Sequence, residues 1–152
     1  MENLLTRPEL TVLALVLVIE SLKALLLGTA TAYQRGKLNK FVNAEDAKWL
    51  GGEVVVHDEP LPARLLRAQR NTLENLATFF ILSIIYILIG ANSTIGLLYF
   101  VSFSISRLAH TYAYLNYKPM LRRNAYTVAW LVQIAMSLHV SVILTGGYIG
   151  GV

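Results

Sequence analysis

Four long runs of apolar residues, separated by short polar segments, dominate the pattern of hydrophobic and polar positions along this chain. Each run has close to the 20 or so mostly apolar residues that an α-helix needs to cross a bilayer. The pattern therefore predicts an all-α integral membrane protein, a four-helix bundle that forms one domain over residues 1–152. The predicted spans are about 10–33, 65–89, 95–114 and 126–148.

The segments between these runs indicate how the predicted helices connect. Residues 90–94 form a short polar turn that contains helix-capping residues, so the second and third helices must be antiparallel neighbours. The first connection, about 34–64, is longer and polar, and it contains Gly51, Gly52, Pro60 and Pro62.

Lys and Arg residues are concentrated in the first and third connections. The first connection holds five of them, the third holds Lys118, Arg122 and Arg123, and the second holds none. Because cytoplasmic loops are enriched in Lys and Arg, we expect these two connections to face the cytoplasm and both termini to lie on the other side. The membrane would be a bacterial inner membrane or the endoplasmic reticulum.

The first apolar run also has a feature of a cleavable signal peptide, because Ala30-Thr31-Ala32 resembles a cleavage site. The run ahead of that site is too long for a signal peptide, however, and it contains Glu20 and Lys23. We therefore expect a membrane helix.

Composition narrows the function classes further. Hydrophobic residues make up 55% of the chain and charged residues 14%, against about 25% charged in soluble domains, and the mean hydropathy is +0.54. The net charge of +4 is explained by the loop arginines and lysines, so we expect no nucleic-acid partner. The chain has no Cys and only three His, which are far apart in the sequence. It therefore has no disulfide and no cysteine nucleophile of its own, and we expect no metal site.

Polar side chains lie within three of the predicted spans, at the ends that face the cytoplasm. Their spacing of three and four residues places each set on one helix face, and ionisable groups inside a membrane are costly and usually functional. We expect the three faces to meet in a cationic cavity with aromatic edges, suited to a small anion with several hydrogen-bonding groups. The sets are Arg67, Arg70, Asn71 and Glu74; Arg107, His110, Tyr114 and Tyr117; and Tyr126, Trp130 and Gln133, near Arg122 and Arg123.

Each of these residues also has a purely structural interpretation. Arg64, Arg67 and Lys118 would extend to lipid phosphates, and several tyrosines would belong to the aromatic belt at the membrane surface. Within helices, Arg70 with Glu74 and Glu20 with Lys23 would form local ion pairs, and His110 would pack between helices. The convergence of three polar faces, more than any single residue, favours a binding site.

Two motifs in these faces are specific: Arg67-Ala-Gln-Arg-Asn71 followed by Glu74, and Arg107-Leu-Ala-His-Thr-Tyr-Ala-Tyr114. They resemble the membrane-associated proteins in eicosanoid and glutathione metabolism, the MAPEG family. Asn43-Ala-Glu-Asp-Ala47 and Gly51-Gly52 also fit, so the similarity extends over nearly the whole chain. The resemblance implies a four-helix subunit of a homotrimer, with glutathione held between neighbouring subunits near the cytoplasmic face.

The resemblance also assigns residues to glutathione. Its contacts would be Arg35 at the end of the first helix, Arg70, Asn71 and Glu74 in the second, and His110 and Tyr114 in the third. In the family, an arginine at the start of the fourth helix lies beside the thiol. Counting without a gap from Tyr114 selects Arg123, followed by Asn124, whereas aligning the pair Tyr126-Thr127 selects Arg122. We favour Arg123, with Asn124 and Tyr126 as further donors to the sulfur.

Glutathione chemistry suits such a set of residues. The tripeptide has two carboxylates, which arginine binds through paired hydrogen bonds, and one ammonium, which Glu74 would bind. A thiol has a pKa of about 8.5, and lowering it by about two units requires roughly 2.7 kcal/mol. Arg123 or Arg122 could supply this in a partly dehydrated pocket. Glutathione would then be the nucleophile, and a lipophilic electrophile or peroxide would arrive from the bilayer.

Asp46 has two interpretations. In the family, an acid at this position lies near the thiol-side arginine and would orient it or transfer a proton. Locally, Asn43 followed by Asp46 three residues later resembles a capping box at the start of a short helix. Both stay open.

Departures from the family concern its prostaglandin-forming members. These have a serine after the key arginine, where this chain has Asn124 or Arg123, and a histidine where this chain has Gln69. The departures weaken the inference to prostaglandin chemistry, but they leave glutathione binding intact.

We therefore expect a glutathione-dependent membrane enzyme: a transferase or peroxidase, or an isomerase of lipid endoperoxides like the prostaglandin E-forming members. The alternative is a non-catalytic scaffold that binds membrane lipids, which the family also contains. A transporter or channel subunit is disfavoured, because the charges gather at one membrane depth.

Overall fold

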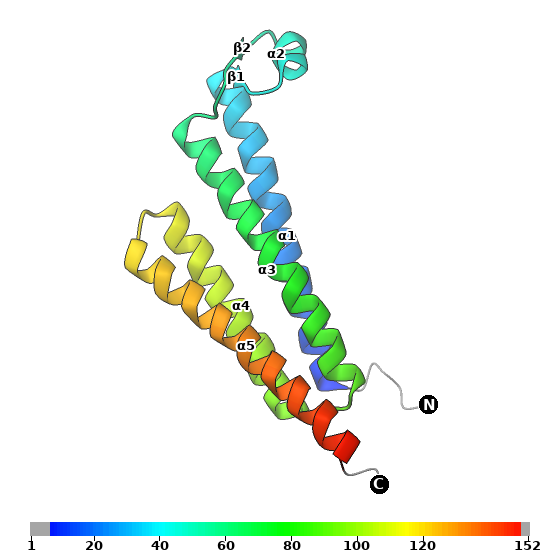
Figure 1. Ribbon diagram of the computed structural model, residues 1–152. Coiled ribbons are helices and arrows are strands. Elements are labelled where there is room, and N and C mark those ends of the chain that lie inside the picture. The colour runs from blue at the N-terminus through cyan, green and yellow to red at the C-terminus, as the bar shows by residue number, and fades with distance from the viewer. Residues whose placement is uncertain (1–6, 150–152) are drawn as a thin grey trace.

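Four long helices make up most of the protein, whose computed structural model describes residues 7–149 (Figure 1). Successive long helices are antiparallel, so all four lie roughly side by side along one direction. The all-α fold class is confirmed for this part of the chain. The helices are α1 (Pro8–Leu38), α3 (Pro60–Leu88), α4 (Ser93–Leu115) and α5 (Pro119–Ile149).

Three of these helices are long and apolar enough to cross a membrane. They are α1, α3 and the Pro119–Gly146 part of α5, whose most apolar windows have mean hydropathies of 2.3, 1.5 and 1.8. These spans establish a membrane protein. Helix α4 has 23 residues, contains the polar Arg107 and His110, and is not among these three helices. Its predicted passage through the membrane stays a prediction.

The helices are longer than the apolar runs, and the first connection is correspondingly shorter than the predicted 34–64. Helix α1 continues to Leu38, where Asn39 adopts a left-handed conformation with φ of 54°. Helix α3 begins at Pro60, so this proline and Pro62 belong to the helix and not to the loop. A proline fits the first helical turn because its φ is already helical and no N–H is needed there.

The connection between α1 and α3 folds around a pair of glycines. Strand β1 (Lys40–Phe41) pairs in parallel with β2 (Glu53–Val54), and the seven-residue helix α2 (Ala44–Leu50) lies between them. Gly51 ends α2 with φ of 71°. A Cβ at Gly52 would lie 2.4 Å from the ring of Phe41, so only glycine leaves room for that buried ring. The chain therefore needs glycine at both positions, for different reasons.

A second feature of this connection is an ion pair at its base. Lys40 donates to Glu59 across 2.5 Å, and this carboxylate raises the pKa of the Lys40 ammonium above its ordinary value.

The central core contains residues of all four long helices. Phe79 of α3 stacks on Phe103 of α4 with ring centroids 3.8 Å apart, and Phe100 meets Phe79 edge-on at 5.8 Å. These rings are fully buried, and Leu13 of α1 and Met136 of α5 complete the same cluster. The core therefore fixes the middle of the bundle, while the ends are held by other contacts.

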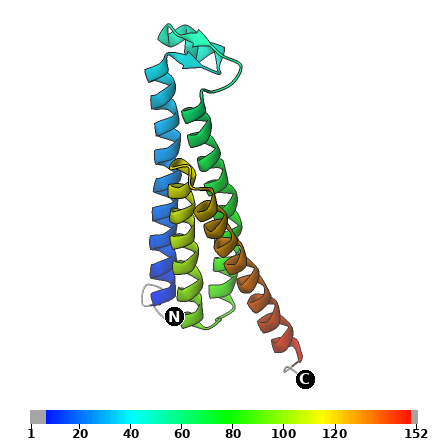
Figure 2. The same cartoon turned by 90° about the vertical axis from the view of Figure 1, so that its left-hand side faces the viewer.

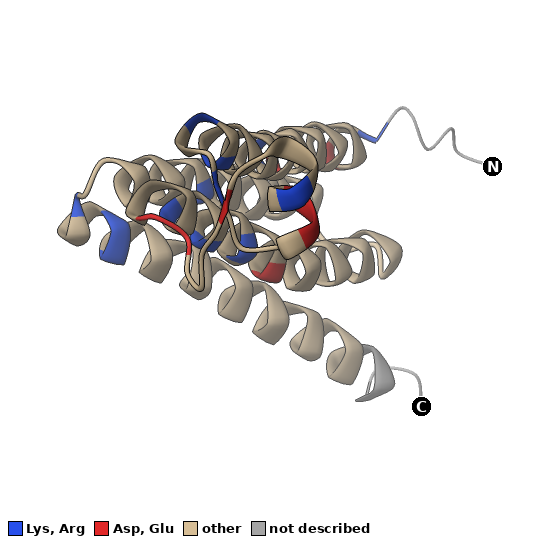
Figure 3. Ribbon diagram, turned by 90° about the horizontal axis from the view of Figure 1, so that it is seen from above, with Lys and Arg blue, Asp and Glu red and all other residues tan. Residues whose placement is uncertain are grey.

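The helices form two closely packed pairs, α1 with α3 and α4 with α5 (Figure 1), and α5 leans away from the other helices toward its C-terminal end (Figure 2). Viewed from the end that carries the β1–α2–β2 connection, Lys and Arg segments gather there, and the distant length of α5 has none (Figure 3). The α4–α5 turn lies toward the same end, as the Lys and Arg distribution requires. Which side of the membrane this end faces stays a prediction.

The aromatic core generates a stability prediction. Replacing Phe79 by Ala is expected to lower the free energy of unfolding by about 3 kcal/mol, because the ring leaves a cavity between Phe100 and Phe103. Ile81 lies in the same helix with 59% of its surface exposed, and Ile81→Ala is the control, with an expected loss of under about 1 kcal/mol. Unfolding of both variants in detergent micelles, followed by circular dichroism, measures the difference. Equal losses would contradict a core centred on Phe79.

Candidate active site

An open cavity of about 530 Å³ lies between α3, α4 and α5 near the charged end of the bundle. This volume is in the range of small-molecule sites. Four guanidinium groups and one carboxylate surround it, so its wall is strongly cationic. The lining residues are Arg67, Arg70, Asn71, Glu74, His110, Tyr114, Arg122, Arg123 and Tyr126.

The three polar faces anticipated from sequence spacing thus meet in the structure. Eight residues expected to bind glutathione or its thiol line this one cavity, three from α3, two from α4 and three from α5. Arg122 and Arg123 belong to the first turns of α5, because the helix already begins at Pro119. Their contacts with a ligand stay a prediction.

Tyr114 is the centre of the aromatic wall. The guanidinium carbon of Arg122 lies 5.0 Å from the Tyr114 ring centroid, and Nε of Arg67 donates to the Tyr114 hydroxyl at 3.1 Å. The buried ring of His110 lies 5.9 Å from Tyr114 and 6.2 Å from Tyr126, between centroids. The rings of α4 and α5 therefore lie side by side at the cavity, and arginines of α3 and α5 contact the Tyr114 ring or its hydroxyl.

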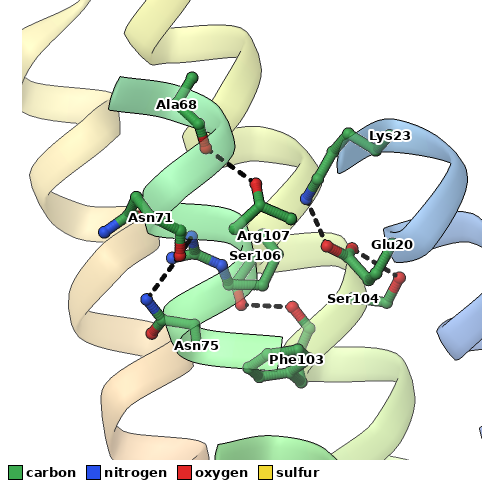
Figure 4. A network of polar contacts seen from close by, with 10 residues as sticks. Glu20, Lys23, Ala68, Asn71, Asn75, Phe103, Ser104, Ser106 and Arg107 are labelled. Atoms are coloured by element: carbon green, nitrogen blue, oxygen red, sulfur yellow. Dashed lines mark hydrogen bonds and ion pairs between the residues drawn. The ribbon is translucent and has the colours of Figure 1, made fainter. Parts of the chain in front are cut away.

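Behind the cavity, Arg107 of α4 holds Asn71 of α3 (Figure 4). Arg107 is 1% exposed, and its Nη2 donates to Asn71 Oδ1 at 2.5 Å and to the Asn71 backbone oxygen at 3.1 Å. Because Oδ1 accepts from Arg107, the Nδ2 group of Asn71 is the part of the amide directed away from Arg107. Asn71 is thereby presented as a hydrogen-bond donor.

Arg107 belongs to a polar face found in the sequence, but sequence reasoning did not assign it a role at the site. An arginine at membrane depth is the signal that could have identified it. Its Nε and Nη1 groups are buried, with no hydrogen-bond partner among the described residues. It acts on the cavity through Asn71 and is not part of the lining.

A second buried polar contact joins α1 to α4. Glu20 is 1% exposed, forms an ion pair with Lys23 one turn later, and accepts from the Ser104 hydroxyl at 3.4 Å. The predicted local pairing of Glu20 with Lys23 is confirmed. Figure 4 shows this pair beside Arg107, so two cations and one acid lie together behind the cavity.

Three predicted site residues do not line the cavity within one chain. Nε and Nη2 of Arg35 both donate to the Asp58 carboxylate at 2.6 Å, which occupies this guanidinium. Asp46 lies on α2, in the connection beyond the ends of α1 and α3. Asn124 is exposed on α5 and is absent from the cavity lining.

The local interpretation of Asp46 holds in part. Asn43 is the N-cap of α2, as predicted, but its side chain accepts no capping hydrogen bond. Instead, Asn43 Nδ2 donates to Asp46 Oδ2 at 2.9 Å. The reciprocal contacts of a capping box are therefore not formed.

The side chains that line the cavity can be compared with the charged groups of glutathione. The arginines and the Asn71 amide supply donors for two carboxylates, and Glu74 supplies the acceptor that an ammonium group needs. Within residues 7–149, no group of three His, Asp or Glu side chains is arranged to hold a metal ion. The donor set fits an anionic peptide-like ligand.

Long apolar helices with a cationic cavity between them define a helical membrane protein. The sequence profile of the MAPEG family matches residues 12–142, and the chain belongs to that family. It is 31% identical to prostaglandin E synthase of Homo sapiens over 137 residues, 90% of each chain. It is 32% identical to prostaglandin E synthase of Rattus norvegicus over 141 residues, 92% of this chain and 90% of the relative.

A relative with another name has a comparable identity over a shorter part of the chain. The chain is 32% identical to microsomal glutathione S-transferase 1 of Mus musculus over 120 residues, 76% of this chain and 77% of the relative. Sequence identity alone therefore does not decide between a prostaglandin E synthase and a glutathione S-transferase.

The buried charges behind the cavity generate a second prediction. Glu20→Leu leaves the charges of Lys23 and Arg107 without an acid beside them and is expected to cost about 3 kcal/mol or more of unfolding free energy. Lys23→Leu leaves Glu20 beside Arg107, so its loss is expected to be smaller. Unfolding of both variants in the same detergent measures the order. A larger loss for Lys23→Leu would contradict this account of charge compensation.

Proposed function

We propose that this protein is a glutathione-dependent membrane enzyme, which ionises the glutathione thiol for attack on a lipophilic electrophile or peroxide. The observation that supports this is the cavity, which combines four arginines with a single acid at one end of an apolar bundle. Binding of two carboxylates and one ammonium needs that combination. The reaction would be a transfer, a peroxide reduction or an isomerisation of a lipid endoperoxide.

Glutathione would lie along the α3 side of the cavity. Arg70 and Arg67 are exposed there and would bind its carboxylates. The Asn71 amide, oriented by Arg107, would donate to a further ligand oxygen. Glu74, one helical turn beyond Arg70, would accept from the ammonium group. Each end of the tripeptide would thus find a group of opposite charge.

For the thiol, the geometry favours Arg122 over the expected Arg123. Arg122 is half-buried and covers the ring of Tyr114, whereas Arg123 is exposed. A half-buried guanidinium stabilises a thiolate more strongly than an exposed one, because water screens it less. Arg122 would therefore hold the thiolate, with the Tyr126 hydroxyl as a second donor, and Arg123 would attract the anionic ligand from the rim.

We also propose the assembly and orientation implied by the family resemblance. The chain would be a four-span subunit of a homotrimer, with α4 as the additional span and the cavity at the cytoplasmic face. A neighbouring subunit would cover the open side of the cavity. The end of α1 with Arg35 and the helix α2 with Asp46 do not line the cavity of their own chain, and a neighbour's copies of them would supply these residues to the ligand.

A non-catalytic lipid-binding scaffold is the second candidate. It is favoured by a second open groove of about 530 Å³ between α1, α3 and α4, whose wall is mostly leucine. Such a groove suits an acyl chain, and a scaffold that binds lipid there would need no glutathione.

The thiolate itself tests the enzyme proposal. Glutathione added to the purified protein at neutral pH is expected to produce the near-ultraviolet absorbance of a thiolate. Arg122→Ala is expected to abolish this absorbance, because about two pKa units of stabilisation are lost, while Arg123→Ala keeps it and weakens binding. Loss in Arg123→Ala alone would restore the assignment to Arg123. No binding and no thiolate in the unmodified protein would refute the enzyme and favour the scaffold.

Glu74 generates a prediction about recognition. Glu74→Gln is expected to weaken glutathione binding by about tenfold, because a hydrogen bond to a charged group contributes about 1.5 kcal/mol or more. The analogue that lacks the amino group should bind equally to both proteins. Calorimetric titration of both ligands against both proteins gives the four binding constants that this comparison needs. An equal loss for the analogue would show that Glu74 does not bind the ammonium group.

A further inference from the structure

A narrower groove of about 390 Å³ continues from the cavity between α3 and α5. It shares Asn71, Glu74 and Tyr126 with the cavity and then extends along both helices as far as Leu82 and Ser137. Ser137 is 11 residues beyond Tyr126 in α5, which corresponds to roughly 16 Å along the helix axis. The groove therefore leads from the proposed glutathione site into the apolar part of the bundle.

The walls of this groove are unusually polar for the apolar part of the bundle. Leu82, Ile134 and Trp130 supply apolar surface, but Asn75, Thr78 and Gln133 face the same space. Polar groups at hydrocarbon depth need hydrogen-bond partners, since neither water nor lipid tails supply them.

Three polar side chains of the groove donate a hydrogen bond to the backbone of their own helix. The Ser137 hydroxyl donates to the Gln133 backbone oxygen at 2.8 Å, and Asn75 Nδ2 donates to the Asn71 backbone oxygen at 2.9 Å. The Thr78 hydroxyl is directed to the Glu74 backbone oxygen at 3.5 Å. The side-chain oxygens of Ser137, Asn75 and Thr78 keep lone pairs that can accept a hydrogen bond from a ligand.

Gln133 is the clearest case. Its Oε1 atom is buried and has no hydrogen-bond partner among the described residues. A ligand that carries its own O–H or N–H group can satisfy this acceptor. A plain hydrocarbon chain would leave Oε1 unpaired.

We propose that this groove binds the lipophilic substrate and that Gln133 selects lipids that carry a hydroxyl group along the chain. The reacting group would lie in the cavity beside Tyr126. Gln133 is seven residues further along α5, so the recognised hydroxyl would lie roughly 10 Å from the reacting group. The substrate class is thus an oxygenated lipid with two separated functional groups. The substrate role rests on the proposed function, whereas the binding of such a lipid does not.

Binding can be measured without catalysis, because Trp130 lines the groove. The other tryptophan, Trp49, is 83% exposed in the connection between α1 and α3, so Trp49→Phe leaves Trp130 as the only tryptophan. The protein in nanodiscs would be titrated with octadecanoic acid and with its positional hydroxy isomers. Their carboxylate would occupy the cationic cavity, and moving the hydroxyl along the chain would locate Gln133.

We expect one narrow range of hydroxyl positions to bind about tenfold more tightly than octadecanoic acid, the value of one hydrogen bond. In Gln133→Leu that preference should disappear, while octadecanoic acid binds at least as well as before. Thr145→Val, in α5 outside the groove, is the control and should keep the preference.

Three results would overturn the proposal: no position preference in the unmodified protein, a preference that survives Gln133→Leu, or no change in Trp130 fluorescence with any of these lipids. The last is also the result expected if a second copy of the chain fills the groove. The proposed enzyme fails separately, by the absence of a glutathione thiolate. A protein that binds the hydroxylated lipid but never ionises glutathione would support the groove and refute the enzyme.

Discussion

The structure depends on the compensation of charged side chains in the interior of the helix bundle, away from water. One acid, Glu20, lies among two cations, Lys23 and Arg107, in the interior of the bundle. The pairing of Glu20 with Lys23 and Ser104 connects α1 to α4, and the Arg107–Asn71 hydrogen bonds connect α4 to α3. Because an unpaired buried charge is far more costly than a lost apolar contact, these bonds determine how the three helices align.

That alignment also shapes the cavity. One acid against two cations leaves a single positive charge behind a wall that is itself rich in arginine. The charge lies in a medium that screens it weakly, so it acts on the cavity more strongly than a surface lysine would. Arg107 therefore contributes twice: its field favours an anionic ligand, and its hydrogen bonds present Asn71 as a donor. The same residues hold the helices and prepare the site.

Most of the site could be predicted because it follows helix periodicity. Spacings of three and four residues place Arg70, Asn71 and Glu74 on one face, and antiparallel neighbours bring that face to His110. The features that sequence reasoning did not predict, the Arg35–Asp58 ion pair and the start of α3 at Pro60, lie at helix ends, where tertiary contacts or a proline decide what the local pattern does not. Nor could periodicity reveal that Gln133 Oε1 is buried without a donor, because this depends on the distance between α3 and α5.

Helix α5 has a further physical consequence. Its 31 residues correspond to about 46 Å, more than the roughly 30 Å of hydrocarbon that they cross. Arg122 and Arg123 lie in its first turns, and no Asp, Glu, Lys or Arg follows them in the helix. Tilt is therefore the means by which α5 adapts to bilayer thickness. Because α5 also supplies one wall of the cavity, a change in its tilt would move that wall relative to α3 and α4.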